Sequence, residues 1–180
     1  MSILTPAVIS AFDDLVKSES TLLDVMTVWH CGSLRGSSSL RVNEGLWVYK
    51  SAEKSRTHAG SAVRDFRLQA VPTTPPYFTE MTIGPKGLRM ANFDGASTHD
   101  ITTTYFNGQH HKAKMALTEW AKRRGFDLIM GTNGGGDEVV VVHPDKHIRF
   151  EKCQDLLTGK WGRKVVHQVK NTPDEDSLTL

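Results

Sequence analysis

The stretch from Gly125 to Phe150 constrains the fold of this chain more than any other part of its sequence. It reads GFDLIMGTNGGGDEVVVVHPDKHIRF, so an apolar segment over 126–130, predicted to be a strand, leads into a glycine-rich loop. Two adjacent carboxylates, Asp137 and Glu138, then precede a run of four valines. Because β-branched apolar residues favour buried strands, the valines predict a strand over 139–142. An acidic residue at the start of such a strand, beside a loop too rich in glycine to pack, is placed to contact a ligand rather than to build a core.

The rest of the chain predicts several more short strands and helices. In chain order these are a helix over 3–17, strands over 22–29 and 45–49, a helix over 51–64, strands over 77–83 and 88–93, and a helix over 109–124. The two strands on either side of the segment GPKG are expected to form a β-hairpin. Residues 94–107 are polar and rich in threonine, which predicts a loop or a weak strand.

This order of elements favours an α+β fold with a split, largely antiparallel or mixed sheet and flanking helices. The chain has neither a GxGxxG motif after a first strand nor a P-loop, which argues against a doubly wound dinucleotide-binding fold. Its 180 residues, 38% hydrophobic and 23% charged, are expected to form one domain over 1–180. Within it we expect an N-terminal helix in 1–20, a core over 21–158 and an extension over 159–180, of which about the last ten residues are mobile.

Bulk features of the sequence indicate a cytoplasmic protein. No apolar run approaches the roughly 20 residues that cross a bilayer, and the N-terminus lacks the basic segment of a secretory signal. Cys31 and Cys153 suggest neither a disulfide framework nor a metal site. His99, His110 and His111 lack the partners of an HExxH or CxxC motif, so we expect them to be solvated and no metal to be bound. The net charge of +2 is too small to indicate nucleic-acid binding on its own.

Three motifs follow one another along the chain. The first is His30 at the end of a predicted strand, followed closely by Gly32-Ser33. The second is GLWVYKSAEKSRTHA, which begins at Gly45, and the third is Glu138 at the start of the valine strand, preceded by GFDLI. In this order they resemble the ADP-ribosyltransferase superfamily, in particular the diphtheria-toxin and poly-ADP-ribose polymerase branch with its His-Tyr-Glu triad. The resemblance spans about two thirds of the chain.

The resemblance implies a catalytic centre and NAD as the co-substrate. Glu138, or alternatively its neighbour Asp137, would hold the 2′-hydroxyl of the nicotinamide ribose and stabilise the cation that develops there. His30 would hydrogen-bond the adenosine ribose. Trp47 stands where the family has its triad tyrosine; alternatively Tyr49 fills that role, with the register shifted by two. Cys31 stands between the histidine and the glycine of the first motif, where the family has no residue.

The resemblance also implies the contacts that hold the nicotinamide. The backbone of Gly32 and the hydroxyl of Ser55 would bind its carboxamide, while Trp47 and His58 would stack on its ring. The full set of implied NAD-binding residues is His30, Gly32, Ser33, Gly45, Trp47, Ser55, His58 and Glu138.

As a whole the resemblance implies a mono-ADP-ribosyltransferase, acting as a bacterial or phage effector, toxin or anti-defence protein in the host cytoplasm. The acceptor would be a protein or a nucleic acid, and the basic residues over 112–124 permit the latter. We expect a monomer or a small oligomer that does not bind membranes.

Two alternatives remain open. The chain could keep the fold and bind its ligand without turnover, because the first and second motifs depart from the family pattern. It could also be a metal-dependent nuclease that uses Asp137 or Glu138 with Glu151 and Lys152. The adjacent positions of the last two argue against this, since neighbouring residues of a strand point to opposite faces.

Overall fold

The computed structural model describes residues 3–32, 43–69, 75–132 and 136–162. The elements in chain order are α1 (Pro6–Leu15), β1 (Ser18–Thr21), β2 (Met26–Gly32), β3 (Leu46–Tyr49), α3 (Ala52–Arg56), α4 (Ala59–Arg67), β4 (Tyr77–Ile83), β5 (Arg89–Asn92), α5 (His99–Phe106), α6 (His110–Arg124), β6 (Leu128–Met130), β7 (Glu138–Val141), α7 (Pro144–His147), β8 (Ile148–Asp155) and β9 (Trp161–Gly162).

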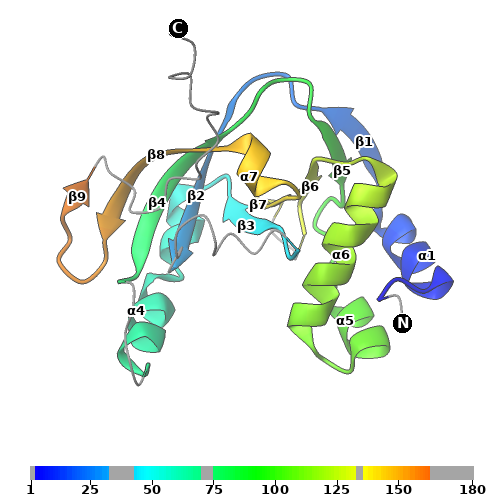
Figure 1. Cartoon of the computed structure of the whole chain (residues 1–180), viewed down its shortest axis with the longest axis horizontal. Helices are drawn as coiled ribbons and strands as arrows, with labels where there is room; N and C mark the ends of the chain where they lie inside the picture. The colour runs from blue at the N-terminus through cyan, green and yellow to red at the C-terminus, as the bar shows by residue number, and fades with distance from the viewer. Residues whose placement is uncertain (1–2, 33–42, 70–74, 133–135, 163–180) are drawn as a thin grey trace, which may run out of the picture.

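The strands form one open nine-stranded sheet in the order β1-β5-β6-β7-β3-β2-β4-β8-β9. The sheet is mixed, because β5 and β6 are parallel while the other neighbouring strands are antiparallel. Helices flank it (Figure 1). The predicted α+β class with a mixed sheet is therefore confirmed.

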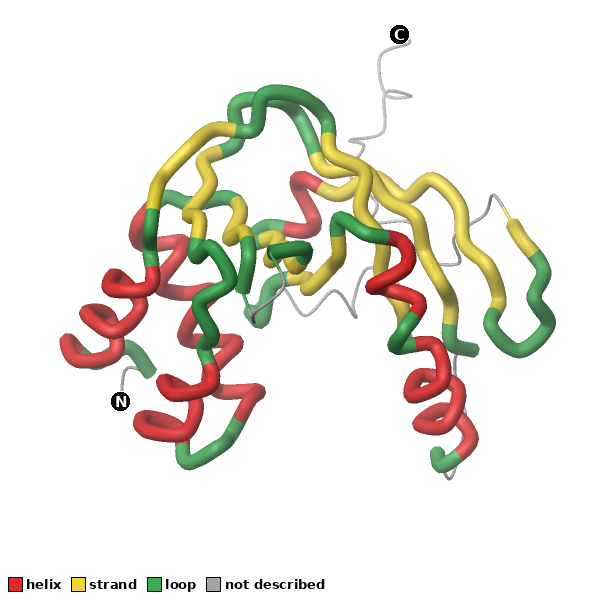
Figure 2. Tube along the Cα trace, turned by 180° about the vertical axis from the view of Figure 1, so that it is seen from behind, coloured by secondary structure: helices red, strands yellow, loops and turns green. Residues whose placement is uncertain are grey.

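The sheet splits between β2 and β3. These strands are registered through a single pair, Trp29 with Tyr49, whereas β2 is registered with β4 over the whole length from Met26 to Gly32. The split leaves two limbs, β1-β5-β6-β7-β3 and β2-β4-β8-β9. Helices α1, α5 and α6 lie beside the first limb and α4 lies below the second, so the two groups of helices stand apart, as Figure 2 also shows from behind.

The valine run of β7 is buried on both faces, which explains why it is continuously apolar rather than alternating. Val140 and Val142 pack into a cluster with Trp120 of α6. Val139 and Val141 pack into a second cluster, which contains residues of both limbs. The strand that begins at Glu138 is thus fixed from both sides.

Some predicted elements differ in the structure. The expected hairpin of 77–83 with 88–93 is wrong, since β4 pairs with β2 and β8 while β5 pairs with β1 and β6. The segment between them crosses from one limb to the other, where Leu22 exchanges backbone hydrogen bonds with Gly87 and Leu88. β1, which no pattern predicted, follows directly after the range predicted to be the first helix, and the strand expected over 22–29 begins only at Met26.

Two helical regions also differ. Residues 99–106, within the predicted loop or weak strand, form α5, which buries Ile101, Thr102 and Phe106. The threonines are compatible with this helix because the Thr102 hydroxyl donates to the backbone oxygen of Thr98 within it. The helix predicted over 51–64 is broken into α3 and α4 next to His58.

Part of the predictions lies outside the described residues, namely Ser33, the middle of the glycine-rich loop and the extension from 163 onward. No helix among the residues that the structure describes combines the length and the apolar character needed to cross a membrane.

Candidate active site

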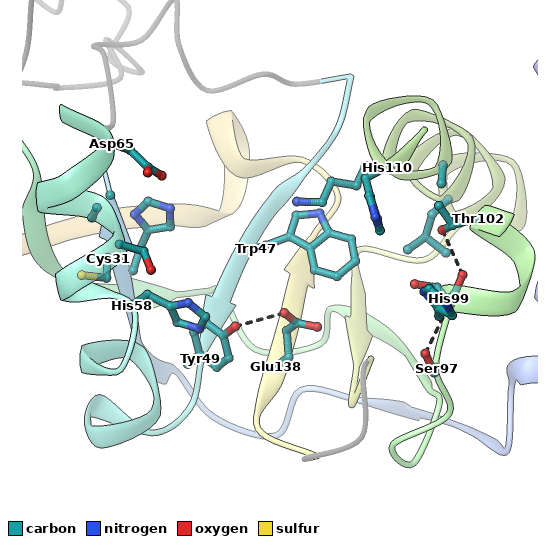
Figure 3. Close-up of a pocket in the computed structure, with 18 of the residues that line it drawn as sticks. Cys31, Trp47, Tyr49, His58, Asp65, Ser97, His99, Thr102, His110 and Glu138 are labelled. Atoms are coloured by element: carbon teal, nitrogen blue, oxygen red, sulfur yellow. Dashed lines mark hydrogen bonds between the residues drawn. The ribbon is translucent and has the colours of Figure 1, made fainter. Parts of the chain in front are cut away.

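A cavity of about 790 Å³ lies at the split in the sheet. Its walls come from β2 and α4 on one side and from α5 and α6 on the other, with β3 and β7 between them (Figure 3). Six residues expected at the NAD site line it: His30, Gly32, Trp47, Tyr49, His58 and Glu138. The cavity thus brings together residues from β2, β3, β7 and the junction of α3 with α4.

Two hydrogen bonds orient the Glu138 carboxylate. The Tyr49 hydroxyl donates to Oε1 at 3.3 Å, and the Thr132 hydroxyl donates to Oε2 at 2.6 Å. Tyr49 and Glu138 are register partners in the β3–β7 pair, which explains how residues so far apart in sequence meet. Thr132 is fully buried just after β6, where Gly131 bonds to the backbone of Glu138. Both oxygens of the carboxylate are therefore held by a donor.

Tyr49 remains a hydrogen-bond donor at neutral pH. Burial, the neighbouring charge of Glu138 and the hydrogen bond to it raise the pKa of Tyr49 to about 12. Its ring also stacks on His58, with ring centroids 5.2 Å apart and planes 26° apart. His58 reaches this position because the chain turns between α3 and α4. Tyr49 therefore links the carboxylate to the imidazole.

In the view of Figure 3, Trp47 lies above Glu138, whereas His58 and Tyr49 lie to its left. Its indole N–H donates to the backbone oxygen of Glu44 at 3.3 Å, and the ammonium of Lys114 lies 4.7 Å from its ring centroid. The aromatic residue that contacts both Glu138 and His58 is thus Tyr49. The structure pairs His58 with Tyr49, where the sequence had suggested Trp47.

His30 has an imidazole that is neutral at pH 7. Its Nδ1 is buried and has no hydrogen-bond partner in the part of the chain that the structure describes. The ring keeps intermediate exposure because it lines the cavity, yet burial, with the charges of Lys114 and His58, lowers its pKa to about 4. Gly32 makes room for this ring, since a Cβ there would lie 3.0 Å from Cε1 of His30.

Other predicted site residues lie elsewhere. Ser55 is fully buried in α3, outside the cavity lining, and its hydroxyl has no partner among the described residues. Gly45 also does not line the cavity; it packs against β7 at the start of β3 with a φ of 66°. Cys31 does line the cavity, and burial raises the pKa of its thiol although Arg56 opposes the shift.

The acidic and basic residues invoked for a nuclease are engaged in the sheet. Glu151 accepts a hydrogen bond from Thr82 at 3.1 Å and lies 3.6 Å from Arg149, while Lys152 pairs with Glu80 at 3.4 Å. Within the described residues, no group of three or more histidine, cysteine or acidic side chains is arranged to hold a metal ion.

Two side chains at the site, Thr132 beside Glu138 and Lys114 in the cavity lining, were not anticipated from the sequence. Thr132 follows a strand that pairs with β7, so the strand–loop–strand pattern is a signal that placed it near Glu138. Lys114 was seen only as part of a basic helix face; its position four residues after His110 is the available signal, since such residues share a helix face.

Comparison with known proteins shows that another protein has a similar fold. No family model and no curated protein matches the sequence. Among solved structures, a chain of the MbcT–MbcA toxin–antitoxin complex from M. tuberculosis is similar, with a TM-score of 0.51. The match covers 86% of this chain and 93% of that chain, at 12% sequence identity. The two chains share a fold. At this identity the similarity says nothing about individual site residues.

Proposed function

We propose that this protein is a mono-ADP-ribosyltransferase that cleaves the nicotinamide–ribose bond of NAD and moves ADP-ribose to a macromolecular acceptor. The observation that carries the proposal is the Glu138 carboxylate, held by Tyr49 and Thr132 at the floor of a cavity that also contains His30. The motif order had suggested His30 and Glu138 and had left the tyrosine role open between Trp47 and Tyr49; we assign it to Tyr49 because of its hydrogen bond to Glu138.

Cleavage of this bond passes through an oxocarbenium-like state, as in glycoside hydrolysis. The Glu138 carboxylate stabilises the developing cation by its negative charge, and one of its oxygens accepts a hydrogen bond from the ribose 2′-hydroxyl. The C1″–N bond breaks and its electrons leave with nicotinamide. A bond from the acceptor to C1″ forms, and the proton of the acceptor is released to Glu138 or to solvent. Tyr49 and Thr132 keep both carboxylate oxygens directed while this occurs.

The nicotinamide ring would be held by Tyr49 and His58. Their centroids are 5.2 Å apart, whereas a ring inserted between them needs two contacts of about 3.5 Å each. Binding in this slot therefore separates the two rings, and the short α3–α4 junction that carries His58 is where the chain can yield. His30 lines the same cavity, and its ring would contact the adenosine ribose there.

The biological setting is part of the same proposal. The similar fold of a chain in a toxin–antitoxin complex supports a role as a bacterial or phage effector or toxin that acts in the cytoplasm. NAD is the co-substrate, and a protein or a nucleic acid is the acceptor.

The test is nicotinamide release from NAD by the wild-type protein and the Glu138→Gln variant. Because the amide cannot stabilise the cation by its charge, we expect release to fall by about a hundredfold or more. Asp137→Asn is the matched control, since Asp137 is adjacent and does not line the cavity. Equal release by wild type and Glu138→Gln would overturn the proposal, as would a collapse in Asp137→Asn alone.

A second candidate is an NAD-binding module without turnover. The direct contact of Tyr49 with His58 favours it, because the slot for nicotinamide is filled by the protein itself. NAD binding measured by calorimetry, with no nicotinamide released in the presence of cell lysate, would distinguish this candidate from the transferase.

A further inference from the structure

One half of the cavity has no role in the proposed cleavage of NAD. It lies beside α5 and α6, across Glu138 from the Tyr49–His58 pair (Figure 3). We call it the acceptor half and define it by Trp47, Ser97, His99, Thr102, His110 and Lys114, all of which line the cavity.

The direction from which the nucleophile attacks assigns this half of the cavity to the acceptor. In a direct displacement the nucleophile approaches C1″ from the face opposite the departing nicotinamide. If nicotinamide leaves between Tyr49 and His58, the acceptor reaches the ribose from the other side of Glu138. This step rests on the proposed function.

The charge of the acceptor half is positive. Lys114 is partly buried, and its ammonium lies 4.7 Å from the Trp47 ring centroid. Among the described residues it forms no ion pair with a carboxylate. The charge of Lys114 is also felt across the cavity, where it contributes to the lowered pKa of His30. A cation without a counterion in a cavity attracts an anionic ligand.

The remaining lining of this half provides hydrogen-bond donors. His99 and His110 contribute imidazoles and Ser97 contributes a hydroxyl, whereas the Thr102 hydroxyl already donates to the backbone oxygen of Thr98. Within the part of the chain that is described, no carboxylate belongs to this half, whereas Asp65 lines the opposite wall on α4. An acidic substrate is therefore favoured on the α6 side of the cavity and not on the α4 side.

We infer that the acceptor is a single-stranded nucleic acid, with a phosphate bound by Lys114 and the base to be modified beside Trp47. An aromatic side chain next to a cation, here Trp47 with Lys114, is a combination that proteins use for single strands. A duplex does not fit, because a stacked and paired base cannot enter a cavity of this size.

The reaction balances without another reactant. A base nitrogen or a hydroxyl of the strand forms the bond to C1″, the bond from C1″ to nicotinamide breaks, and one proton is released. The products are the ADP-ribosylated strand and nicotinamide.

The test separates transfer from cleavage. Labelled NAD is incubated with single-stranded RNA or DNA oligonucleotides, with the matching duplex, or with nuclease-treated lysate protein, and both labelled acceptor and free nicotinamide are measured. We expect Lys114→Gln to reduce the ratio of transfer to nicotinamide release at least tenfold. Lys114→Arg should restore the ratio, because it restores the charge. Lys112→Gln is the control, since Lys112 is exposed on the same helix outside the cavity lining.

Binding provides a second readout. The affinity of Glu138→Gln protein for a fluorescent oligonucleotide is measured by anisotropy at several salt concentrations. Adding Lys114→Gln should reduce the slope of log K against log salt by about 0.7, the value for one phosphate contact on a single strand.

Three outcomes would overturn the inference. One is label on lysate protein with oligonucleotides neither bound nor modified, which would leave the proposed function intact. Another is an equal fall of nicotinamide release and transfer in Lys114→Gln, which would place Lys114 at the NAD itself. The third is oligonucleotide binding that does not depend on Lys114. Absence of nicotinamide release from the wild type under every condition would instead refute the transferase.

Discussion

At the scale of single residues, the Glu138 carboxylate is held by donors from two different strand ends. Tyr49 comes from β3, and Thr132 follows β6, so each carboxylate oxygen has its own hydroxyl. Thr132 is fully buried, and its hydroxyl donates to Glu138. We therefore regard Thr132 as a positioning residue for Glu138.

Thr132→Val tests this role, because valine keeps the shape of the side chain and removes the donor. Hydrogen bonds to charged groups contribute about 1.5–3 kcal/mol, so we expect kcat for nicotinamide release to fall roughly tenfold to hundredfold. KM for NAD should change less, since Thr132 does not line the cavity. Thr132→Ser, which keeps a hydroxyl, should recover most of the rate. If valine and serine behave alike, the hydroxyl is not what positions Glu138.

The sequence identified which residues gather at this cavity better than it identified how they are paired. Glu138, His30 and His58 were named from the motif order, and the structure places all three at one cavity. The choice between Trp47 and Tyr49 depends on which residue is registered with Glu138, and cross-strand register is a tertiary property. Trp47 and Tyr49 are two apart in one strand, so the alternation of side chains could not distinguish them.

At the scale of the elements, the start of β3 is the tightest point near the site. Gly45 has a φ of 66°, and a Cβ there would lie 3.0 Å from Val140 Cγ1 and 3.0 Å from the backbone oxygen of Val141. The hydroxyl of Thr118 on α6 would be 3.2 Å away. Glycine is needed here for the backbone angle and for the close approach of β3 to β7 and α6.

Gly45→Ala should therefore destabilise the protein. A non-glycine residue at such a φ costs about 1–3 kcal/mol, and the crowded Cβ adds to this. The free energy of unfolding from chemical denaturation is the measurement. Gly60→Ala is the matched control, because Gly60 lies within α4 with no atom within 4 Å of its would-be Cβ. There alanine should stabilise by about 0.5–1 kcal/mol. Equal stability of the two variants would contradict this account of β3.

The elements also show where pattern reasoning succeeds. The helix predicted over 109–124 corresponds to α6, and the valine strand to β7, because both have long, regular apolar patterns. The predicted hairpin of 77–83 with 88–93 was wrong because a turn motif indicates only the local path of the chain. Strand pairing places β4 beside β8 in one limb and β5 beside β6 in the other. β1 was not predicted because Ser18–Thr21 is polar and exposed and is held by backbone pairing to β5.

At the scale of the whole molecule, the split sheet places the cavity between two limbs whose adjoining strands, β2 and β3, are registered through one pair. His30 on β2 belongs to one limb, while Tyr49 and Glu138 belong to the other. The mixed sheet was predicted from the element order. The position of the split could not be predicted, because it depends on how β2 and β3 pair with strands that are far away in the sequence.

His30 makes the stability of this arrangement depend on pH. Its pKa in the folded protein is about 4, below its ordinary value of 6.5, first because of burial and then because of the charges of Lys114 and His58. Between these values the unfolded chain binds a proton that the folded protein does not, so stability falls as pH decreases from about 6.5 towards 4. Above 6.5 this contribution is constant.

His30→Gln removes the contribution of His30, so the unfolding free energy of the variant should change less between pH 6.5 and 4 than that of the wild type. His99→Gln is the control, because it removes an exposed histidine and leaves the buried ring of His30 in place. Parallel pH profiles for wild type and His30→Gln would show that His30 is protonated as easily in the folded protein as in the unfolded chain, and that the cavity does not shield it.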